Sequence, residues 1–257
     1  MNKNIALLVT SFDGYNDLWE PLDSNFGIYV DKNIDCYLMT NFIKPNLKNL
    51  SYLDIGQDLS WSENLQKAIN KISNYDYIFL TLDDVFFKKK LRYLDLAKYC
   101  NEMKKNNANY LSLLNRPSAK FIKINQEFSF ISKDSLYPVS AGLCIWKLDE
   151  LKNYLSRKNS AWEYEKTFKI HDEKNFMSLN FNFHEVIHLV VRGKLYPSAI
   201  KELEKQKIYL KTDRKRYLKI IEIFHIFRDS FRSVFIRLLL SLNLVNVLRF
   251  IRILLKK

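Results

Sequence analysis

Three kinds of feature are scarce in this sequence: cysteine, glycine with proline, and long uncharged apolar runs. The three cysteines are odd in number and widely spaced, so they indicate neither a disulfide framework nor a zinc site, and we expect a reducing, cytoplasmic environment. The apolar stretch at residues 5–9 is too short for a signal peptide, and residues 238–248 are too few to span a bilayer as a helix. With only five glycines and five prolines, the chain contains no low-complexity linker.

The positive charge is concentrated in the C-terminal part of the chain. The formal net charge is +13, and residues 211–257 contribute 12 Lys and Arg against 3 Asp and Glu. The rest of the chain carries 29 basic and 25 acidic side chains and is nearly balanced. Because 47% of the residues are hydrophobic, the chain can bury a full core. We therefore expect a domain over 1–210 and a basic amphipathic helical tail over 211–257.

Strand-like and helix-like runs alternate through the first two thirds of the chain. Apolar, β-branched and aromatic runs predict strands at 5–11, 34–41, 75–84 and 109–115. The segment 183–197 is expected to contain a further strand that runs into a turn at Gly193. Apolar positions with a helical period predict helices at 62–73, 90–107 and 160–174, with Ser62 and Ser160 as N-caps of the first and last. This alternation is typical of an α/β fold with a mostly parallel sheet flanked by helices.

Two adjacent carboxylates, Asp83 and Asp84, follow the predicted strand at 75–84. Like charges at the end of a buried strand repel each other and lose hydration unless a cation or hydrogen-bond donors offset the cost. Ligands of open α/β sheets bind at this end of the strands. A divalent metal carrying a diphosphate would remove the repulsion, because Mg²⁺ and Mn²⁺ prefer carboxylate and phosphate oxygens. The alternative is that both residues only cap and solvate the start of a loop.

Four segments occur in an order that resembles the GT-A superfamily of nucleotide-sugar glycosyltransferases, and in particular bacterial enzymes of lipopolysaccharide or capsule synthesis. They are "TSFDGYNDLWEP" at 10–21, "LSWSENLQKAI" at 59–69, "LTLDDVFF" at 80–87 and "SAWEYE" at 160–165. The resemblance covers roughly residues 5–200. It implies a Rossmann-like GT-A fold and a hexosyltransferase that moves a sugar from a nucleotide donor, UDP above all, to a growing surface glycan. It also implies an inverting, metal-dependent reaction.

The resemblance makes "LDD" the counterpart of the Asp-x-Asp metal motif, with the spacer absent. It implies that Asp84 coordinates Mn²⁺ or Mg²⁺ and that Asp83 binds sugar hydroxyls, ribose or a metal-bound water. A late histidine, His184 or His188, is the candidate third ligand, and a histidine packed on a strand is the alternative for either one.

Donor-binding residues are expected in three loops. Thr10, Ser11 and Asp13 follow the first strand and could bind uracil or ribose, although an ordinary turn explains them equally well. Gly142 would let the backbone approach the donor or acceptor, or it is a tight bend between strands. Lys194 could reach a diphosphate by charge, or it lies in a solvated loop.

The catalytic base is expected in "AWEYE", which supplies Glu163 and Glu165. An inverting transfer needs one carboxylate to take the proton of the acceptor hydroxyl. Residues two apart on a helix point about 200° from one another, so one of the two is expected to face the cleft. Glu163 is favoured and Glu165 is the alternative. The competing interpretation is a capping-box Glu163 with a solvated Glu165.

The tail predicts attachment to a membrane surface. From residue 243 onward, polar and basic positions recur every three or four residues opposite apolar ones, as in an interfacial helix attracted to anionic lipid. This would place the protein at the inner face of the cell membrane, near a lipid-linked glycan acceptor. Terminal helices packed on the body or on a second subunit are the alternative. No nucleic-acid signature is present, so no nucleic-acid partner is expected. The alternative function is a non-catalytic α/β protein docked by its tail.

Overall fold

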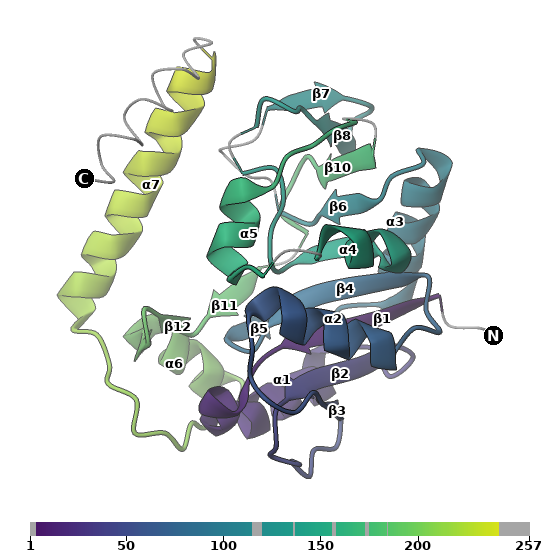
Figure 1. The fold of residues 1–257 in the computed structure, drawn as a ribbon. Coiled ribbons are helices and arrows are strands. Elements are labelled where there is room, and N and C mark those ends of the chain that lie inside the picture. The colour runs from purple at the N-terminus through teal and green to yellow at the C-terminus, as the bar shows by residue number, and fades with distance from the viewer. Residues whose placement is uncertain are drawn as a thin grey trace.

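The computed structural model describes residues 4–114, 120–135, 137–155, 158–172, 175–183 and 185–241. Its centre is a nine-stranded mixed sheet with strand order β3-β2-β1-β4-β9-β6-β10-β8-β7, and helices cover both faces (Figure 1). The expected α/β class is confirmed. The first four strands of the order are parallel, whereas β9 runs antiparallel to both β4 and β6.

The strands of the described chain are short and follow the apolar runs of the sequence. They are β1 (Ile5–Thr10), β2 (Asp35–Thr40), β3 (Ser51–Asp54), β4 (Tyr77–Leu82), β5 (Val85–Phe87), β6 (Tyr110–Ser112), β7 (Phe121–Lys123), β8 (Phe128–Ile131), β9 (Cys144–Lys147), β10 (Phe176–Leu179), β11 (Val186–His188), β12 (Val190–Val191) and β13 (Lys194–Leu195). The helices are the 3₁₀ helix η1 (Asp13–Leu18) and α1 (Trp19–Tyr29), α2 (Trp61–Lys71), α3 (Tyr93–Lys105), α4 (Leu148–Tyr154), α5 (Ala161–Thr167), α6 (Pro197–Lys205) and α7 (Lys219–Ser241).

Two hydrophobic cores fill the two faces of the sheet. Along β1, Leu7 and Val9 belong to the core under α1 and α3, whereas Ala6 and Leu8 belong to the core under α2, α4 and α5. Since successive strand residues point to opposite faces, a strand buried on both sides must be apolar at every position. This explains why "IALLV" is uninterrupted, and it fixes β1 in the middle of the molecule.

The register of β1 against β4 places the polar ends of both strands together. Thr10 pairs with Leu82 at the last position of this parallel ladder. Ser11 and Asp83 come directly after these residues, so they leave the sheet side by side at its carboxyl edge. This is the edge at which ligands of open α/β sheets bind.

Capping boxes start two of the helices beside that edge. The Ser60 side chain accepts a hydrogen bond from the Glu63 backbone, and the Glu63 carboxylate accepts from the Ser60 backbone. Ser60, not Ser62, is therefore the N-cap of α2, and the expectation of Ser62 was wrong. Ser62 is buried and instead accepts a hydrogen bond from the Asn159 backbone. Ser160 caps α5 as expected, with Glu163 completing the box.

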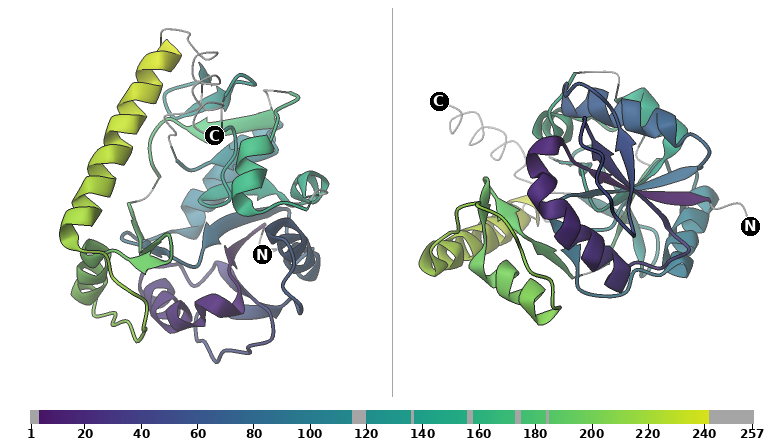
Figure 2. Two further views of the ribbon diagram at one scale, coloured as in Figure 1. Left: turned by 60° about the vertical axis from the view of Figure 1, so that its left-hand side comes forward. Right: turned by 90° about the horizontal axis from the view of Figure 1, so that it is seen from below.

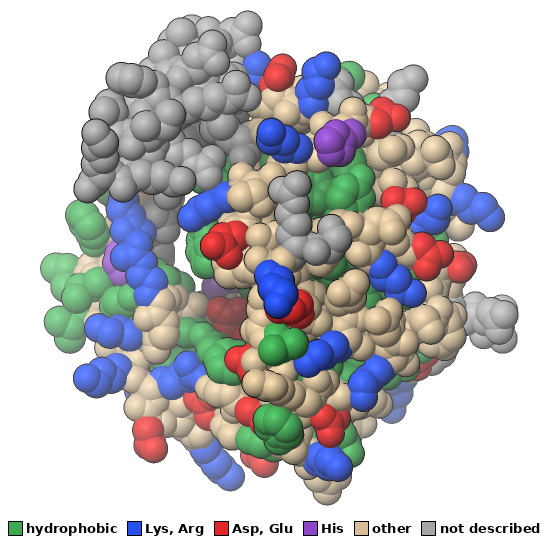
Figure 3. All heavy atoms as spheres, viewed as in Figure 1, with side chains coloured by type: hydrophobic (Ala, Val, Ile, Leu, Met, Phe, Trp, Pro, Cys, Tyr) green, Lys and Arg blue, Asp and Glu red, His purple; other side chains and the backbone are tan. Residues whose placement is uncertain are grey.

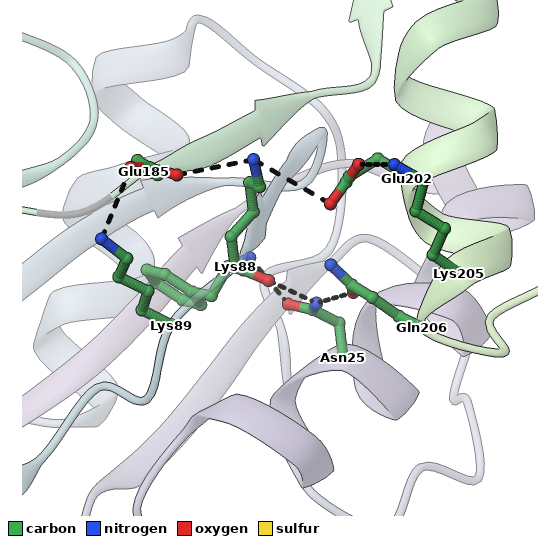
Figure 4. A network of polar contacts seen from close by, with 8 residues as sticks. Asn25, Lys88, Lys89, Glu185, Glu202, Lys205 and Gln206 are labelled. Atoms are coloured by element: carbon green, nitrogen blue, oxygen red, sulfur yellow. Dashed lines mark hydrogen bonds and ion pairs between the residues drawn. The ribbon is translucent and has the colours of Figure 1, made fainter.

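Polar contacts hold β5 and β11 in place next to the acidic pair (Figure 4). The buried Asn25 side chain donates to the Phe87 carbonyl and accepts from the Phe87 backbone N–H. Lys88 adds ion pairs to Glu185 and Glu202 at 3.5 and 3.9 Å. Exposed ion pairs contribute little to stability, so the buried hydrogen bonds of Asn25 contribute more to holding β5 in place than the ion pairs of Lys88.

The C-terminal part begins with a small hairpin. Gly193 has φ +76°, a value that favours glycine, and it turns β12 into β13 as the sequence predicted. After α6, residues 211–218 lead to α7, the long helix that stands beside the sheet-containing body (Figure 2). No helix in the described part of the chain is long and apolar enough to cross a membrane. The interfacial helix predicted from residue 243 lies outside the described residues.

Candidate active site

A short hydrogen-bonded chain fixes the first carboxylate. Asp83 is 8% exposed, and the Ser11 hydroxyl donates to its Oδ2 at 2.5 Å. The Trp19 indole N–H donates in turn to the Ser11 oxygen at 2.8 Å. Trp19 is a core residue of α1, and it also orients the serine. Ser11 is therefore held toward Asp83 rather than left free in a turn.

The environment raises the pKa of both acids. Burial is the main cause for Asp83 and raises its pKa to about 8, the Asp84 charge adds to the rise, and the Ser11 hydrogen bond opposes it. Burial also raises the pKa of Asp84, and the neighbouring charges of His188 and Arg214 act in the opposite direction. Burial therefore favours the protonated form of Asp83 in the folded protein. A cation beside the pair would favour the charged form and release that proton.

A cavity of about 460 Å³ opens beside the pair, within the size range of small-molecule sites. Its lining combines the polar strand ends with several aromatic rings, and consists of Thr10, Ser11, Phe12, Tyr15, Met39, Asp58, Leu59, Trp61, Asn64, Leu82, Asp83, Asp84, Ala161 and Trp162. Segments from β1, η1, α2, β4 and α5 thus meet around one space.

The metal ligands expected from the sequence are partly brought together. His188 ends β11, pairs with Val85 next to Asp84, and opposes the rise in the Asp84 pKa that burial causes. His184 lies outside the described residues. Over the residues that are described, no group of three or more His, Cys, Asp and Glu is arranged to hold a metal ion. The pair fits an ion that takes one or two carboxylates and completes its shell with substrate phosphate and water.

Asp13 is occupied by the protein backbone. Its carboxylate accepts hydrogen bonds from the N–H groups of Asn41, Phe42 and Ile43 at 2.8, 2.9 and 3.1 Å. This is the turn-forming alternative, because three donors hold the carboxylate on the loop after β2. Thr10 lines the cavity and donates to the Thr81 carbonyl at 3.2 Å.

The two glutamates of α5 point to different partners. The Glu163 carboxylate accepts from the Ser160 backbone and hydroxyl, each at 2.8 Å, and these bonds lower its pKa. The Glu165 carboxylate accepts from the Ala141 backbone at 2.8 Å and from the Ser140 hydroxyl at 3.2 Å. The contacts of Glu163 are therefore those of a capping box. Glu165 connects α5 to the loop of Gly142 by hydrogen bonds. Neither glutamate is among the residues that line the cavity.

Gly142 and Lys194, both expected to bind the donor, do not line the cavity. A Cβ at Gly142 would meet Leu82 Cγ at 3.0 Å, so this loop packs tightly on the residue before Asp83. Lys194 lies in β13 with its ammonium 5.3 Å from the centre of the Tyr217 ring. It is not a lining residue of the cavity.

Sequence reasoning missed Arg214, which it counted as part of the basic tail. Its guanidinium makes a two-pronged contact to Asp17, with Nε–Oδ2 2.7 Å and Nη2–Oδ1 2.8 Å, and donates to the Gly14 carbonyl. It also lies 4.1 Å from the centre of the Tyr15 ring, which lines the cavity. Its charge opposes the rise in the pKa of Asp83 and Asp84 that burial causes. No local signal could reveal this contact, because about two hundred residues separate its partners.

Among known proteins, this chain resembles solved structures in its fold. No family model and no curated protein matches the sequence. Matches among solved structures include TarS of S. aureus, at 11% identity over 68% of this chain and 36% of that one, with a TM-score of 0.42. UDP-glucose pyrophosphorylase matches at 9% identity over 79% of this chain and 98% of that one, with a TM-score of 0.48.

A third match is CMP:2-keto-3-deoxy-manno-octonic acid synthetase, at 13% identity over 64% of this chain and 83% of that one, with a TM-score of 0.38. The chain spans about a third of the length of TarS, which has also been solved with UDP-GlcNAc. Identities and TM-scores this low do not discriminate among α/β enzymes, and function has to be inferred from the site itself.

Proposed function

We propose that this protein is a GT-A-type glycosyltransferase that moves a sugar from a nucleotide donor, a UDP-sugar, to a growing bacterial surface glycan. The observation that carries the proposal is the pair formed by the buried Asp83 and the half-buried Asp84 in the wall of an aromatic-lined cavity at the carboxyl end of β4. The ordered motifs that resemble the GT-A superfamily point to the same chemistry.

The acidic pair is suited to a divalent cation. Burial makes the charged form of Asp83 costly, and a bound cation is the simplest way to offset that cost. Asp84 is the first candidate ligand, with Asp83 beside it and His188 nearby. When bound, Mn²⁺ or Mg²⁺ would neutralise the negative charge that develops on the departing diphosphate.

The aromatic walls are suited to a base or a sugar ring. Tyr15 and Trp61 line the cavity between the strand ends and α2, and Trp162 lies in its wall although its side chain is 70% exposed. A large exposed aromatic ring at a pocket often stacks on a ligand. A nucleoside diphosphate would stack its base against these rings and place its phosphates beside the carboxylates.

A carboxylate of α5 would take the proton from the acceptor hydroxyl. Glu163 is committed to its capping box, and its lowered pKa makes it a weaker base. Glu165 is therefore the better candidate, held at the loop of Gly142 by the Ala141 N–H.

Thermal unfolding with UDP and Mn²⁺ tests the donor site. Ligand that binds the folded state raises the melting temperature, so the wild-type protein should melt several degrees higher with UDP and Mn²⁺ together. Asp84→Asn should abolish this shift without lowering the melting temperature of the ligand-free protein. Asp149→Asn, an exposed acid at the start of α4, is the matched control and should behave as wild type.

Two results would contradict the proposal: no shift in the wild-type protein, or a full shift in Asp84→Asn. Hydrolysis of UDP-sugars then separates an enzyme from the alternative, a non-catalytic α/β protein docked by its C-terminal part. The alternative predicts no turnover with any nucleotide sugar.

A further inference from the structure

Helix α7 presents an apolar stripe to solvent. Seven of the exposed apolar side chains that the structure describes on this helix follow a helical period of three to four residues and are Ile220, Ile223, Phe224, Phe227, Phe231, Val234 and Phe235. Phe227 is 70% exposed and Phe231 67% exposed. With about 200 Å² per phenylalanine, the four of them expose roughly 500 Å² in three turns. A contiguous apolar patch of this size is typical of an interaction surface.

The opposite side of the helix is the side that contacts the body. Glu222 is buried, and its carboxylate accepts hydrogen bonds from the Ser198 hydroxyl and backbone at the start of α6. One turn later, the His225 ring is hydrogen-bonded to the Tyr196 hydroxyl at 3.1 Å. These contacts fix the rotation of α7 about its axis, so the apolar stripe faces away from α6.

Basic side chains accompany the stripe. Lys219 and Arg228 are exposed on α7, and residues 211–241 carry 8 Lys and Arg against 3 Asp and Glu. One of those three acids, Glu222, is withdrawn from the surface by its contact to Ser198. Hydrophobic and basic side chains lie together along the described part of this side of the molecule (Figure 3).

We infer that α7 lies on an anionic lipid surface, with its phenylalanine stripe at the level of the acyl chains and its basic side chains among the headgroups. Phe next to Lys and Arg is the composition of interfacial helices, and anionic headgroups complement the charge. A second copy of the chain is less suited, because two segments with an excess of five positive charges each would repel one another. The inference does not depend on the donor site.

Sedimentation of the full-length protein with vesicles tests this inference. We expect binding to vesicles of phosphatidylcholine with phosphatidylglycerol, little binding to phosphatidylcholine alone, and weaker binding at 0.5 M salt, since salt screens the headgroup attraction. The double variant Phe227→Glu, Phe231→Glu should lose at least tenfold in partition to the anionic vesicles. Leu94→Glu is the matched control, because Leu94 is 76% exposed on α3 of the body, and it should bind as wild type.

Each outcome decides the matter. Both phenylalanines are exposed, so the double variant should keep the wild-type melting temperature, its circular dichroism and any UDP-dependent shift. Equal vesicle binding by wild type and double variant would overturn the inference, as would no binding by wild type. A wild-type dimer that the double variant converts to a monomer, with vesicle binding unchanged, would assign the stripe to a second copy instead.

Discussion

At the scale of single residues, the molecule separates groups that look alike in sequence. Asp83 and Asp13 both follow strands beside the same cavity edge, yet one is buried with a single hydroxyl donor and the other is held by three backbone N–H groups. Burial with few hydrogen-bond donors makes the charged form of a carboxylate costly, and this applies to Asp83. Asp83 therefore remains available to a cation, whereas Asp13 holds a loop.

The raised pKa of Asp83 predicts a specific pH dependence of stability. Below pH 4 this carboxyl is protonated in both states, and between about pH 4 and 8 the folded state keeps a proton that the unfolded chain releases. The free energy of unfolding should therefore fall as pH rises through this window, by roughly 1.4 kcal/mol per pH unit from this group. The Asp83→Asn side chain can still accept a hydrogen bond from the Ser11 hydroxyl but cannot ionise. Its free energy of unfolding should therefore not fall with pH in this way.

Urea unfolding at pH 5, 7 and 9 in the presence of a chelator measures the difference in free energy of unfolding between wild type and Asp83→Asn. The stability of Asp83→Asn relative to wild type should increase steadily with pH. Asp149→Asn again serves as the control, because its side chain is 85% exposed. Parallel curves for wild type and Asp83→Asn would show that Asp83 ionises normally in the folded protein.

At the scale of elements, helix α5 gives different roles to Glu163 and Glu165, which are two residues apart. Residues 163 and 165 lie on different sides of the helix, so one carboxylate caps the N-terminus and the other reaches the loop of Gly142. The spacing "S-x-x-E" alone was sufficient to predict the capping box. Which carboxylate faces a neighbouring loop depended on where the sheet places α5.

The two glutamates should respond differently to loss of charge. Glu165→Gln keeps a group that accepts from the Ala141 N–H but removes the base, so turnover should drop at least a hundredfold with the donor KM nearly unchanged. Glu163→Gln should retain turnover and lower the melting temperature slightly, because the cap weakens. Steady-state kinetics and thermal melts of both variants check this. The reverse pattern would return the base to Glu163.

At the scale of the whole molecule, Arg214 joins the C-terminal part of the chain to the start of the site. It holds Asp17 of η1 and covers the Tyr15 ring in the cavity wall. Residues 211–218 are therefore in contact with the N-terminal body, although their charge alone placed them in a tail. A segment that leads into α7 thus touches the wall of the candidate donor cavity.

Breaking this contact should weaken donor binding. Arg214→Ala removes the guanidinium that covers the Tyr15 ring, and Asp17→Asn weakens the two-pronged contact that holds this guanidinium. Each should therefore raise the donor KM by on the order of tenfold with a smaller effect on kcat. Arg214→Lys keeps the charge without the planar fork and should be intermediate. Arg216→Ala, an exposed neighbour, is the control. Unchanged KM in both Arg214→Ala and Asp17→Asn would limit the contact to stability.

Much of the secondary structure could be predicted because it depends on local chemistry. The runs at 5–11 and 34–41 contain β1 and β2 entirely, since strands buried in a central sheet are apolar at most positions. The cap of α2 was misplaced by two residues because "SWS" offers two serines, and only Ser60 has Glu63 three positions on. The antiparallel direction of β9 was not predicted, since nothing in a short apolar run states its direction.

The sequence by itself determined the α/β class, the turn at Gly193, the capping box of α5 and the placement of two acids after a buried strand, because each of these depends on neighbours within a few residues. Only the tertiary structure decided that Ser11 and Trp19 brace Asp83, that three backbone donors occupy Asp13, and that Arg214 closes over Tyr15. The reason is physical: the charge state and orientation of a buried polar group depend on which distant donors and charges the fold brings within a few ångströms.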